Sequence, residues 1–206
     1  MRRQSSEGNF RLQTILRRRS IRRYTDKPVP RSLIERTLEA AIWAPSAHNR
    51  QPWRFAVVTE AGTRALLAEA MASRLRRDLE ADGVDEAAIV KDTQRSYARI
   101  SSAPVVIMVC LTMTDMDVYP DAGRSALEYH MAGQSTAMAG MNLLLAAYES
   151  GLGACWMCAP LFCPDVARTV LALPEDWQPQ GLITMGYPAE SREKTRHPLE
   201  KTILWR

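Results

Sequence analysis

A long, mostly apolar tract between Ser125 and Gly151 constrains the fold more than any other part of the sequence. Apolar residues would cover most of the circumference of a helix here, so that helix must lie at the centre of the protein or of a subunit interface. Gly133 and Gly140 would let neighbouring elements approach it closely. Polar residues such as Gln134 and Glu149 make the tract a poor membrane span. We therefore expect a buried helix and no membrane partner.

Four other apolar runs predict strands. The run RFAVVT (54–59) is short and β-branched, which suits a strand buried on both faces. The remaining strand candidates are PVVIMVCLT (104–112), ACWMC (154–158) and QGLITMGYP (180–188).

Helical spacing recurs in three further places. From Leu33 to Ile42 the apolar residues follow a helical period, Ser32 can cap the start, and Pro45 closes the segment. Two charged, lid-like helical stretches occupy residues 62–101 on either side of ADGVD, and PDVARTVLAL (164–173) predicts a short helix. Strands and helices are mixed without a regular βαβ rhythm, and no GxGxxG follows a strand. The sequence thus favours an α+β fold over a dinucleotide-binding Rossmann domain.

The chain should form one domain, because its 206 residues contain no internal repeat. Residues 1–13 are expected to be flexible and residues 189–206 to form a charged, proline-punctuated arm. The N-terminus lacks an apolar signal region, so four cysteines indicate a reducing cytoplasm. Cys155 and Cys158 form a CxxC without a second pair at zinc spacing, and we interpret them as buried thiols, with no metal site.

The net charge of +4 is concentrated in the segment RRRSIRRY, which holds Arg17, Arg18, Arg19, Arg22 and Arg23. Such a cluster can bind nucleic acid, an acidic membrane or a phosphorylated ligand, or can simply be a solvated surface. Guanidinium groups beside a serine hydroxyl suit a terminal phosphate. Nucleic acid is not an expected partner, because aromatic residues do not alternate with the arginines.

A second polar segment, APSAHNRQPW, lies between a predicted helix and a predicted strand. The side-chain amides of Asn49 and Gln51 offer paired donors and acceptors, which match the imide and carbonyl edges of a flavin ring. Pro, Ser and Asn also form ordinary turns, so a plain connection explains the segment equally well.

The order of these segments resembles the FMN-dependent nitroreductase family. RRSIRRYTDKPVP, a helix and APSAHNRQPWRFAVV are similar to its N-terminal signature, NLLLAAYESGLGACWM to its central helix and next strand, and GYP with KTRHP to its closing strand and tail. The resemblance runs from Thr14 to the C-terminus. DVYPDAGRSALE and LFCPDVARTVLALPEDWQPQG resemble the flavin domain of the bacterial deazaflavin-coenzyme glutamyl ligase, whose ligase domain has no counterpart here.

This resemblance implies a three-layer α-β-α sandwich around a mixed, mainly antiparallel sheet, in an intertwined homodimer with FMN at the interface. The phosphate and ribityl chain would be held by Arg18, Arg19, Ser20, Arg22, Lys194 and Arg196. The flavin ring would meet a loop from the partner chain, formed by Pro45, Ser46, His48, Asn49 and Gln51. Backbone groups of Cys158 and Ala159 would face the redox-active ring nitrogen, while Pro160 has no N–H to donate.

The resemblance also implies a ping-pong transfer of hydride from NADH or NADPH to a nitroaromatic, quinone or enone. No catalytic side chain is required, although His48 is a weak candidate for a proton donor, and His130 is interpreted as a core or interface residue. Alternatives are reduction of one biosynthetic intermediate, oxygen-dependent flavin destruction as in a cobalamin-ligand synthase, and flavin binding without turnover. The acceptor, the preferred nicotinamide and the number of electrons transferred stay open.

Overall fold

A computed structural model describes residues 12–206, which form a four-stranded antiparallel sheet with the strand order β1-β2-β4-β3. The strands are β1 (Trp53–Val58), β2 (Val105–Leu111), β3 (Gly153–Met157) and β4 (Gln178–Gly186). All four predicted strands are therefore present. The parallel component of the sheet is a single bridge between Ser20 and Ala154 at its β3 edge.

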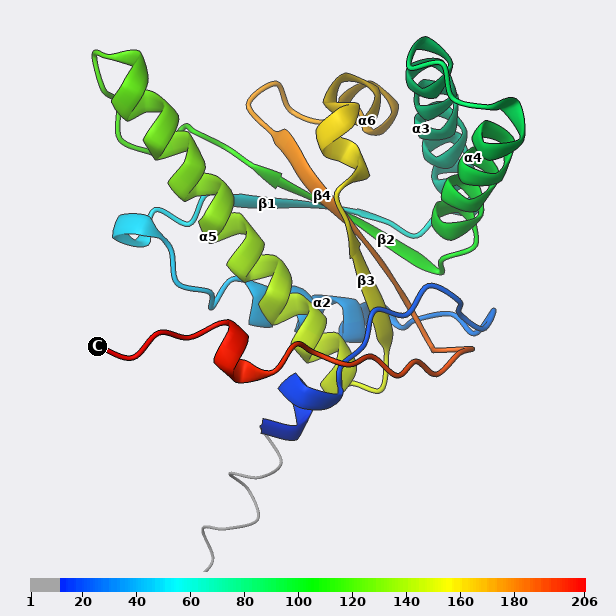
Figure 1. Ribbon diagram of the computed structural model, residues 1–206, viewed down its shortest axis with the longest axis horizontal. Helices are drawn as coiled ribbons and strands as arrows, with labels where there is room; N and C mark the ends of the chain where they lie inside the picture. The colour runs from blue at the N-terminus through cyan, green and yellow to red at the C-terminus, as the bar shows by residue number, and fades with distance from the viewer. Residues whose placement is uncertain (1–11) are drawn as a thin grey trace, which may run out of the picture.

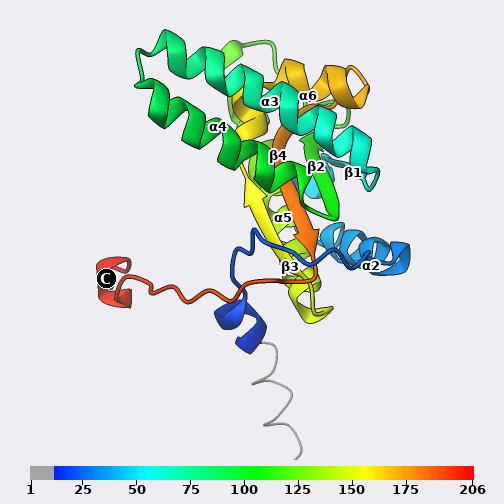
Figure 2. The same ribbon diagram turned by 90° about the vertical axis from the view of Figure 1, so that its right-hand side faces the viewer.

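Helices cover both faces of this sheet (Figure 1, Figure 2). One face carries α2 (Arg31–Ala41) and α5 (Ala122–Glu149), and the other carries α3 (Ala61–Ala81), α4 (Glu86–Ser101) and α6 (Pro164–Leu171). The expected three-layer α-β-α sandwich is confirmed. Among the described helices, none combines the length and apolarity of a membrane span.

Strand β2 lies at the centre of the structure, and all seven of its residues are buried. Its side chains alternate between the two helical layers. Val105, Ile107 and Val109 pack with α5, whereas Val106 and Met108 pack with α3 and α4. A strand with helices on both faces has no solvated side, and this explains its nearly continuous apolar sequence.

Strand β1 corrects one expectation. It pairs only with β2 and is an edge strand, and only Trp53 and Val58 within it are buried. The prediction of burial on both faces was wrong because the apolar run identifies a strand but not its position in the sheet.

The start of α2 differs from its predicted position. The helix begins at Arg31, directly after Pro30, so Ser32 lies inside the first turn and does not cap it. The carbonyl of Pro30 accepts from the N–H groups of Leu33 and Ile34. A backbone turn thus provides the start that the serine was expected to provide.

Helix α5 buries one side against the sheet and α2, and exposes apolar residues on the other. Asp121 caps it by accepting from the N–H of Arg124 at 2.8 Å. Leu127, Met138, Met141 and Tyr148 are exposed on the part of the helix that faces away from the sheet. The helix is therefore central on one side and uncovered on the other within this chain.

The Trp156 ring of β3 fills a slot made by two glycines, Gly140 of α5 and Gly181 of β4. A Cβ atom added at Gly140 would lie 2.8 Å from Cε3 of the Trp156 ring, and one at Gly181 would meet the same ring. The absence of two Cβ atoms thus lets α5 approach the sheet closely at this point.

Beyond β4 the chain leaves the body as an extended tail (Figure 2). Residues 189–206 contain only a short turn, Leu199–Lys201, and nearly all their side chains are exposed. Of the N-terminal range expected to be flexible, residues 1–11 lie outside the described residues, while Leu12 and Gln13 belong to a short helix at 12–17.

We predict that Gly140→Ala destabilises the fold by about 1–3 kcal/mol, because the added methyl group overpacks the Trp156 slot. Urea unfolding followed by circular dichroism measures the change. The matched control is Gly62→Ala in α3, where the nearest atom to an added Cβ is 3.8 Å away, so stability should stay the same or rise by up to about 1 kcal/mol. Equal behaviour of the two variants would contradict the proposed packing.

Candidate active site

The arginine-rich segment after the first helix is fixed along the β3 edge of the sheet. Its Ile21 N–H donates to the carbonyl of Ala154 at 3.1 Å, and the N–H of Thr25 donates to Tyr187 at 2.9 Å. The Ile21 side chain is buried against Gly153, where a Cβ atom would approach it to 2.8 Å. Arg18, Ser20 and Arg22 are therefore held on an ordered backbone.

The Tyr24 hydroxyl ties this segment to β4. It lies 2.6 Å from the carbonyl oxygen of Ile21, 3.0 Å from that of Thr184 and 2.8 Å from Thr184 Oγ1. Burial raises the pKa of Tyr24 well above its ordinary value, so the hydroxyl keeps its proton and can donate at neutral pH.

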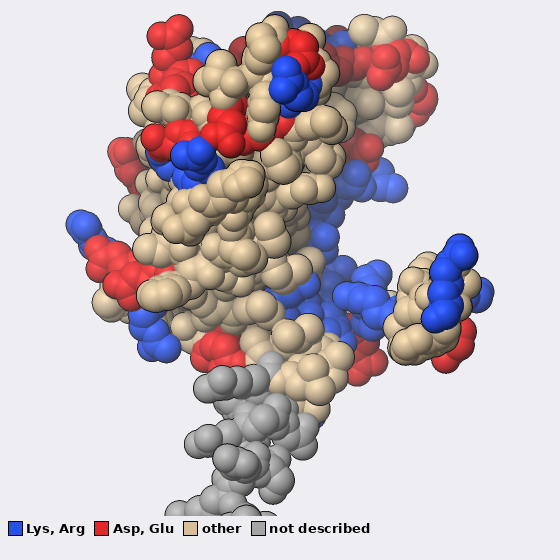
Figure 3. All heavy atoms as spheres, turned by 90° about the vertical axis from the view of Figure 1, so that its left-hand side faces the viewer, with Lys and Arg blue, Asp and Glu red and all other residues tan. Residues whose placement is uncertain are grey.

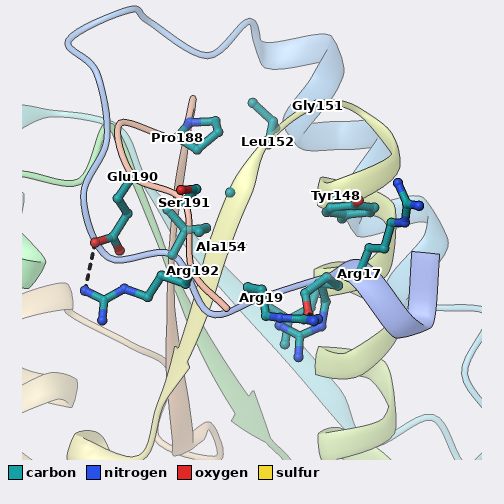
Figure 4. A pocket seen from close by; sticks show the side chains of 14 residues that line it. Arg17, Arg19, Tyr148, Gly151, Leu152, Ala154, Pro188, Glu190, Ser191 and Arg192 are labelled. Carbon is teal, nitrogen blue, oxygen red and sulfur yellow. Dashed lines mark hydrogen bonds and ion pairs between the residues drawn. The ribbon is translucent and has the colours of Figure 1, made fainter. Parts of the chain in front are cut away.

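Two concave surfaces flank this segment. The first, which we call the Tyr148 pocket, has a volume of about 450 Å³ and an apolar wall that includes Leu144, Tyr148, Leu152 and Ala154. Figure 4 shows Arg17 and Arg19 on its Tyr148 side and Arg192, paired with Glu190, across β3. Arg18 also lines it.

The second, which we call the arginine pocket, has a volume of about 430 Å³. It is lined by Ala98, Ser102 and five arginines: Arg22, Arg23, Arg95, Arg99 and Arg192. Burial lowers the pKa of Arg99, and repulsion from Arg22 and Arg95 lowers it further. Three segments distant in sequence therefore bring positive charge to one place.

The predicted phosphate-binding set is divided between these pockets. Arg18 and Arg19 line the Tyr148 pocket, and Arg22 lines the arginine pocket. Arg196 lies close enough to Arg18 to lower its pKa, although burial lowers that pKa more. Lys194 is exposed on the tail.

Ser20 lines neither pocket but hydrogen-bonds Cys155 on β3. Burial raises the pKa of the Cys155 thiol, and the nearby Arg22 and the Ser20 hydrogen bond oppose this effect. The positively charged segment and the start of β3 thus form one contiguous region.

The loop predicted to meet a flavin ring lies on the opposite side of the sheet from the arginine segment (Figure 1). His48, Asn49 and Gln51 have positive φ angles of 48°, 55° and 52°, which non-glycine residues rarely adopt. Ser46 supports this conformation, because its Oγ accepts from the Gln51 N–H at 3.0 Å. Strained backbone of this kind concentrates at functional sites.

Most side chains of this loop are exposed to solvent. The side chains of Pro45, His48, Asn49 and Gln51 point into solvent, and Ser46 is half-buried. No residue of this loop lines either pocket, so a single chain does not bring the loop and Arg18 into one pocket.

Cys158 and Ala159 lie directly after β3. The Cys158 sulfur is exposed and accepts from Nε1 of Trp156 at 3.2 Å, which corrects the prediction that it is a buried thiol. The backbone carbonyl of Cys158 accepts from the Leu161 N–H at 3.0 Å, and Pro160 is buried. The strand end is a tight turn, and this brings the sulfur to the surface.

Among the histidines, His48 is exposed in the strained loop, and His130 is exposed on α5 with its Nε2 3.0 Å from Nε2 of Gln134. The interpretation of His130 as a core residue was wrong, because it lies on the outer side of the helix. Its alternative role as an interface residue stays a prediction.

Sequence reasoning missed three arginines of the arginine pocket, Arg95, Arg99 and Arg192, and it named Arg23 in the basic cluster but not among the phosphate-binding residues. Arg95 and Arg99 are four residues apart on α4 and so share one face of that helix. This spacing was visible in the sequence, but whether Arg95 and Arg99 lie near Arg22 depends on how α4 packs.

Comparison with known proteins decides the family, because residues 15–187 match the Nitroreductase family. The chain belongs to the nitroreductase family. It is thus an oxidoreductase by descent, and the expected family is confirmed.

Its relatives agree in sequence and in fold. A Thermus thermophilus protein named NADH dehydrogenase is 36% identical, with 93% of each chain covered. The structure of a protein described as a nitroreductase, in complex with FMN, from Desulfovibrio desulfuricans is 30% identical with a TM-score of 0.73, covering 95% of this chain and 96% of that one. A BluB-like flavoprotein from Clostridium difficile has the same fold at 22% identity, with a TM-score of 0.79 and coverage of 95% and 98%.

We predict that one of the four thiols reacts rapidly in the native protein at pH 8. Cys158 is exposed, whereas burial raises the pKa of Cys155 and Cys163 and raises that of Cys110 to about 12, so these three stay protonated. Titration with a chromogenic disulfide measures the count, with all four reacting after unfolding. The Cys158→Ser variant should lose the rapid phase, and its persistence would show that another thiol is accessible.

Proposed function

We propose that this protein is a homodimeric, FMN-dependent oxidoreductase that transfers hydride from NADH or NADPH to nitroaromatics, quinones or related electron-poor acceptors. The observation that carries the proposal is the placement of Arg18 and Ser20 at the start of β3, whose other end leads to Cys158 and Ala159. At about 3.3 Å per residue, three residues of β3 span about 10 Å. This length is comparable to an extended ribityl chain between a phosphate and a flavin ring.

The chemistry of the arginine segment fits the phosphate of FMN. Arg18 is partly buried, and both burial and the neighbouring Arg196 and Arg19 lower its pKa. A dianion beside Arg18 would offset this repulsion and would accept charge-assisted hydrogen bonds from the guanidinium. The FMN complex of the Desulfovibrio relative supports the same cofactor here.

A homodimer would cover the apolar surface that a single chain leaves exposed. Besides the outer residues of α5, Ile42 and Trp43 after α2 and Leu204 and Trp205 at the end of the tail are exposed. The face in Figure 3 is mostly uncharged, with Lys and Arg side chains gathered toward the tail. Contiguous apolar surface of this kind is typical of an interface.

The partner chain would then supply the strained loop. Ser46, Asn49 and Gln51 are too far around the sheet to meet Arg18 within one chain, so the flavin ring would be contacted by the loop of the other subunit. Its fixed backbone would hold the amides of Asn49 and Gln51 at the ring edge, and His48 would lie beside the acceptor.

When bound, FMN supplies the hydride-accepting and hydride-donating chemistry. The residues of this chain would bind the cofactor and orient it. Arg18, Ser20 and Arg196 hold the phosphate, the backbone at Cys158 and Ala159 meets the ring, and Pro160 contributes no donor. The four free thiols support a reducing compartment such as the cytoplasm.

The direct test is to saturate the purified protein with FMN, desalt it and add NADH or NADPH without oxygen. About one flavin per chain should stay bound and its yellow absorbance should bleach. Turnover with a nitroaromatic or quinone would then follow. Retained flavin that neither nucleotide bleaches would indicate a binding protein or a different reductant, and loss of all flavin would refute the cofactor site.

We predict that Arg18→Gln weakens FMN binding about 10- to 100-fold, since one charge-assisted contact to the phosphate is lost. Flavin fluorescence titration gives the Kd. Riboflavin, which has no phosphate, should bind wild type and variant alike, and Arg36→Gln on the exposed face of α2 is the matched control. An equal effect on FMN and riboflavin would remove Arg18 from the phosphate site.

A heterodimer tests the contribution of the partner loop. If Arg18 and Asn49 serve one flavin from two subunits, a dimer of one Arg18→Gln chain and one Asn49→Ala chain keeps one intact site. Co-expression with two affinity tags should give about half the tightly bound FMN of wild type, while either homodimer gives little. If both residues acted from the same chain, each heterodimer site would carry one substitution, and neither site would bind FMN as wild type does.

A further inference from the structure

Three residues of the loop between α2 and β1 have positive φ angles, and contacts from outside the loop hold this strained backbone. His48, Asn49 and Gln51 have φ angles of 48°, 55° and 52°. Such backbone persists only where its surroundings fix it. Ser46 fixes it from within the loop. Two further contacts come from outside, and both lead to the buried side of α5 (Figure 1).

The first of these contacts is direct. Ser135 of α5 is almost fully buried, and its Oγ accepts from the N–H of Ala47 at 3.2 Å. The same hydroxyl donates to the carbonyl of Met131 at 2.8 Å, so its orientation is fixed within the helix. Ser135 thus holds the start of the strained backbone.

The second contact passes through the segment that follows β2. Arg50, in the middle of the strained backbone, forms an ion pair with Asp117. The N–H of Asp117 donates to Oε1 of Glu128 on α5 at 3.2 Å. Met116, the residue before Asp117, is buried in an apolar cluster with Ala132 of α5. Arg50 is therefore held by a carboxylate whose own backbone is fixed by α5.

The stability of the fold does not explain why residue 128 is a glutamate. Glu128 is fully buried, and its second carboxyl oxygen, Oε2, has no hydrogen-bond partner among residues 12–206. Burying such an oxygen costs free energy, which an apolar side chain of similar size would avoid. The hydrogen bond that Glu128 does form leads to the loop through Asp117.

We propose that Glu128 is a positioning residue of the proposed flavin site. Through Asp117 and Arg50 it holds the strained backbone of the loop. That backbone presents the amides of Asn49 and Gln51 to the flavin ring. The inference rests on the proposed function, which assigns this loop to the ring. Because Glu128 is fully buried, it acts on the ring only through the loop.

Limited trypsin digestion of the full-length protein tests whether Glu128 holds the loop. Trypsin cleaves after arginine, and the bond after Arg50 lies within the strained backbone. Glu128→Met removes the oxygen that accepts from Asp117, so this cleavage should become about 3- to 10-fold faster. Glu128→Gln keeps an acceptor oxygen and should be cleaved like wild type. Cleavage after Arg36, on the exposed face of α2, reports opening of the whole fold and should not change in either variant.

Flavin binding tests whether the position of the loop matters to the ring. Glu128→Met should weaken FMN and riboflavin equally, about 3- to 10-fold, because the loop meets the ring and not the phosphate. Arg18→Gln, in contrast, should affect FMN alone. Asp117→Ala, at a half-buried position, should match Glu128→Met in both experiments and decides the question if Glu128→Met does not fold. The matched control is Glu69→Met on the exposed side of α3, which should leave both affinities unchanged.

Three results would overturn the inference. Unchanged cleavage after Arg50 in Glu128→Met and Asp117→Ala would show that these residues do not hold the loop. Equal acceleration of the cleavages after Arg50 and Arg36 would show that Glu128 supports the whole fold. Faster cleavage after Arg50 with unchanged affinity for both flavins would show that the loop does not position the ring.

Failure of the inference is distinguishable from failure of the proposed function, because the digestion requires no flavin. If the wild type binds FMN and is bleached by a nicotinamide but Glu128→Met behaves like it, only the role of Glu128 is refuted. If the wild type retains no flavin, the proposed function itself fails, and with it any role of Glu128 at a flavin.

Discussion

The pairing of residues 20–25 with the β3 edge is the contact on which the site depends. The Ile21 N–H bonds Ala154, the Tyr24 hydroxyl contacts Ile21 and Thr184, and the Thr25 N–H bonds Tyr187. Free arginines on a mobile terminus would lose much conformational entropy on binding an anion. Here the sheet has already ordered their backbone, so their charge is presented at a defined place.

This arrangement separates two kinds of surface. Positive charge gathers along β3 and α4, where the sheet edge, the tail and a helix converge. Uncharged, apolar surface lies along the outer side of α5 and after α2. Burying the apolar surface against a second chain would bring a strained loop toward a charged segment that its own chain holds far away. In the proposed homodimer, assembly and cofactor binding would therefore depend on each other.

The sequence predicted elements better than their surroundings. The apolar run of β2, the long α5 and the charged pair α3 and α4 were all recognisable, because burial and helical period leave direct patterns. The sequence did not show how far β1 is buried or how α2 is capped. It also did not show that Cys158 and His130 are exposed. The burial of β1 depends on its position in the sheet and that of His130 on the side of the helix that it occupies, whereas backbone turns set the start of α2 and the exposure of Cys158. The arginines of α4 escaped notice because their surroundings depend on how that helix packs.

By itself the sequence determined the family, the order of the elements and the residue types available to hold a phosphate, since spacing and composition are local properties. Only the tertiary structure decided which arginines share a pocket, that Arg18 and Arg22 face different ones, and that the Ser46–Gln51 loop lies apart from both. The physical reason is that electrostatic interactions depend on distance in space. Chain separation says little about that distance once helices have packed on the two faces of a sheet.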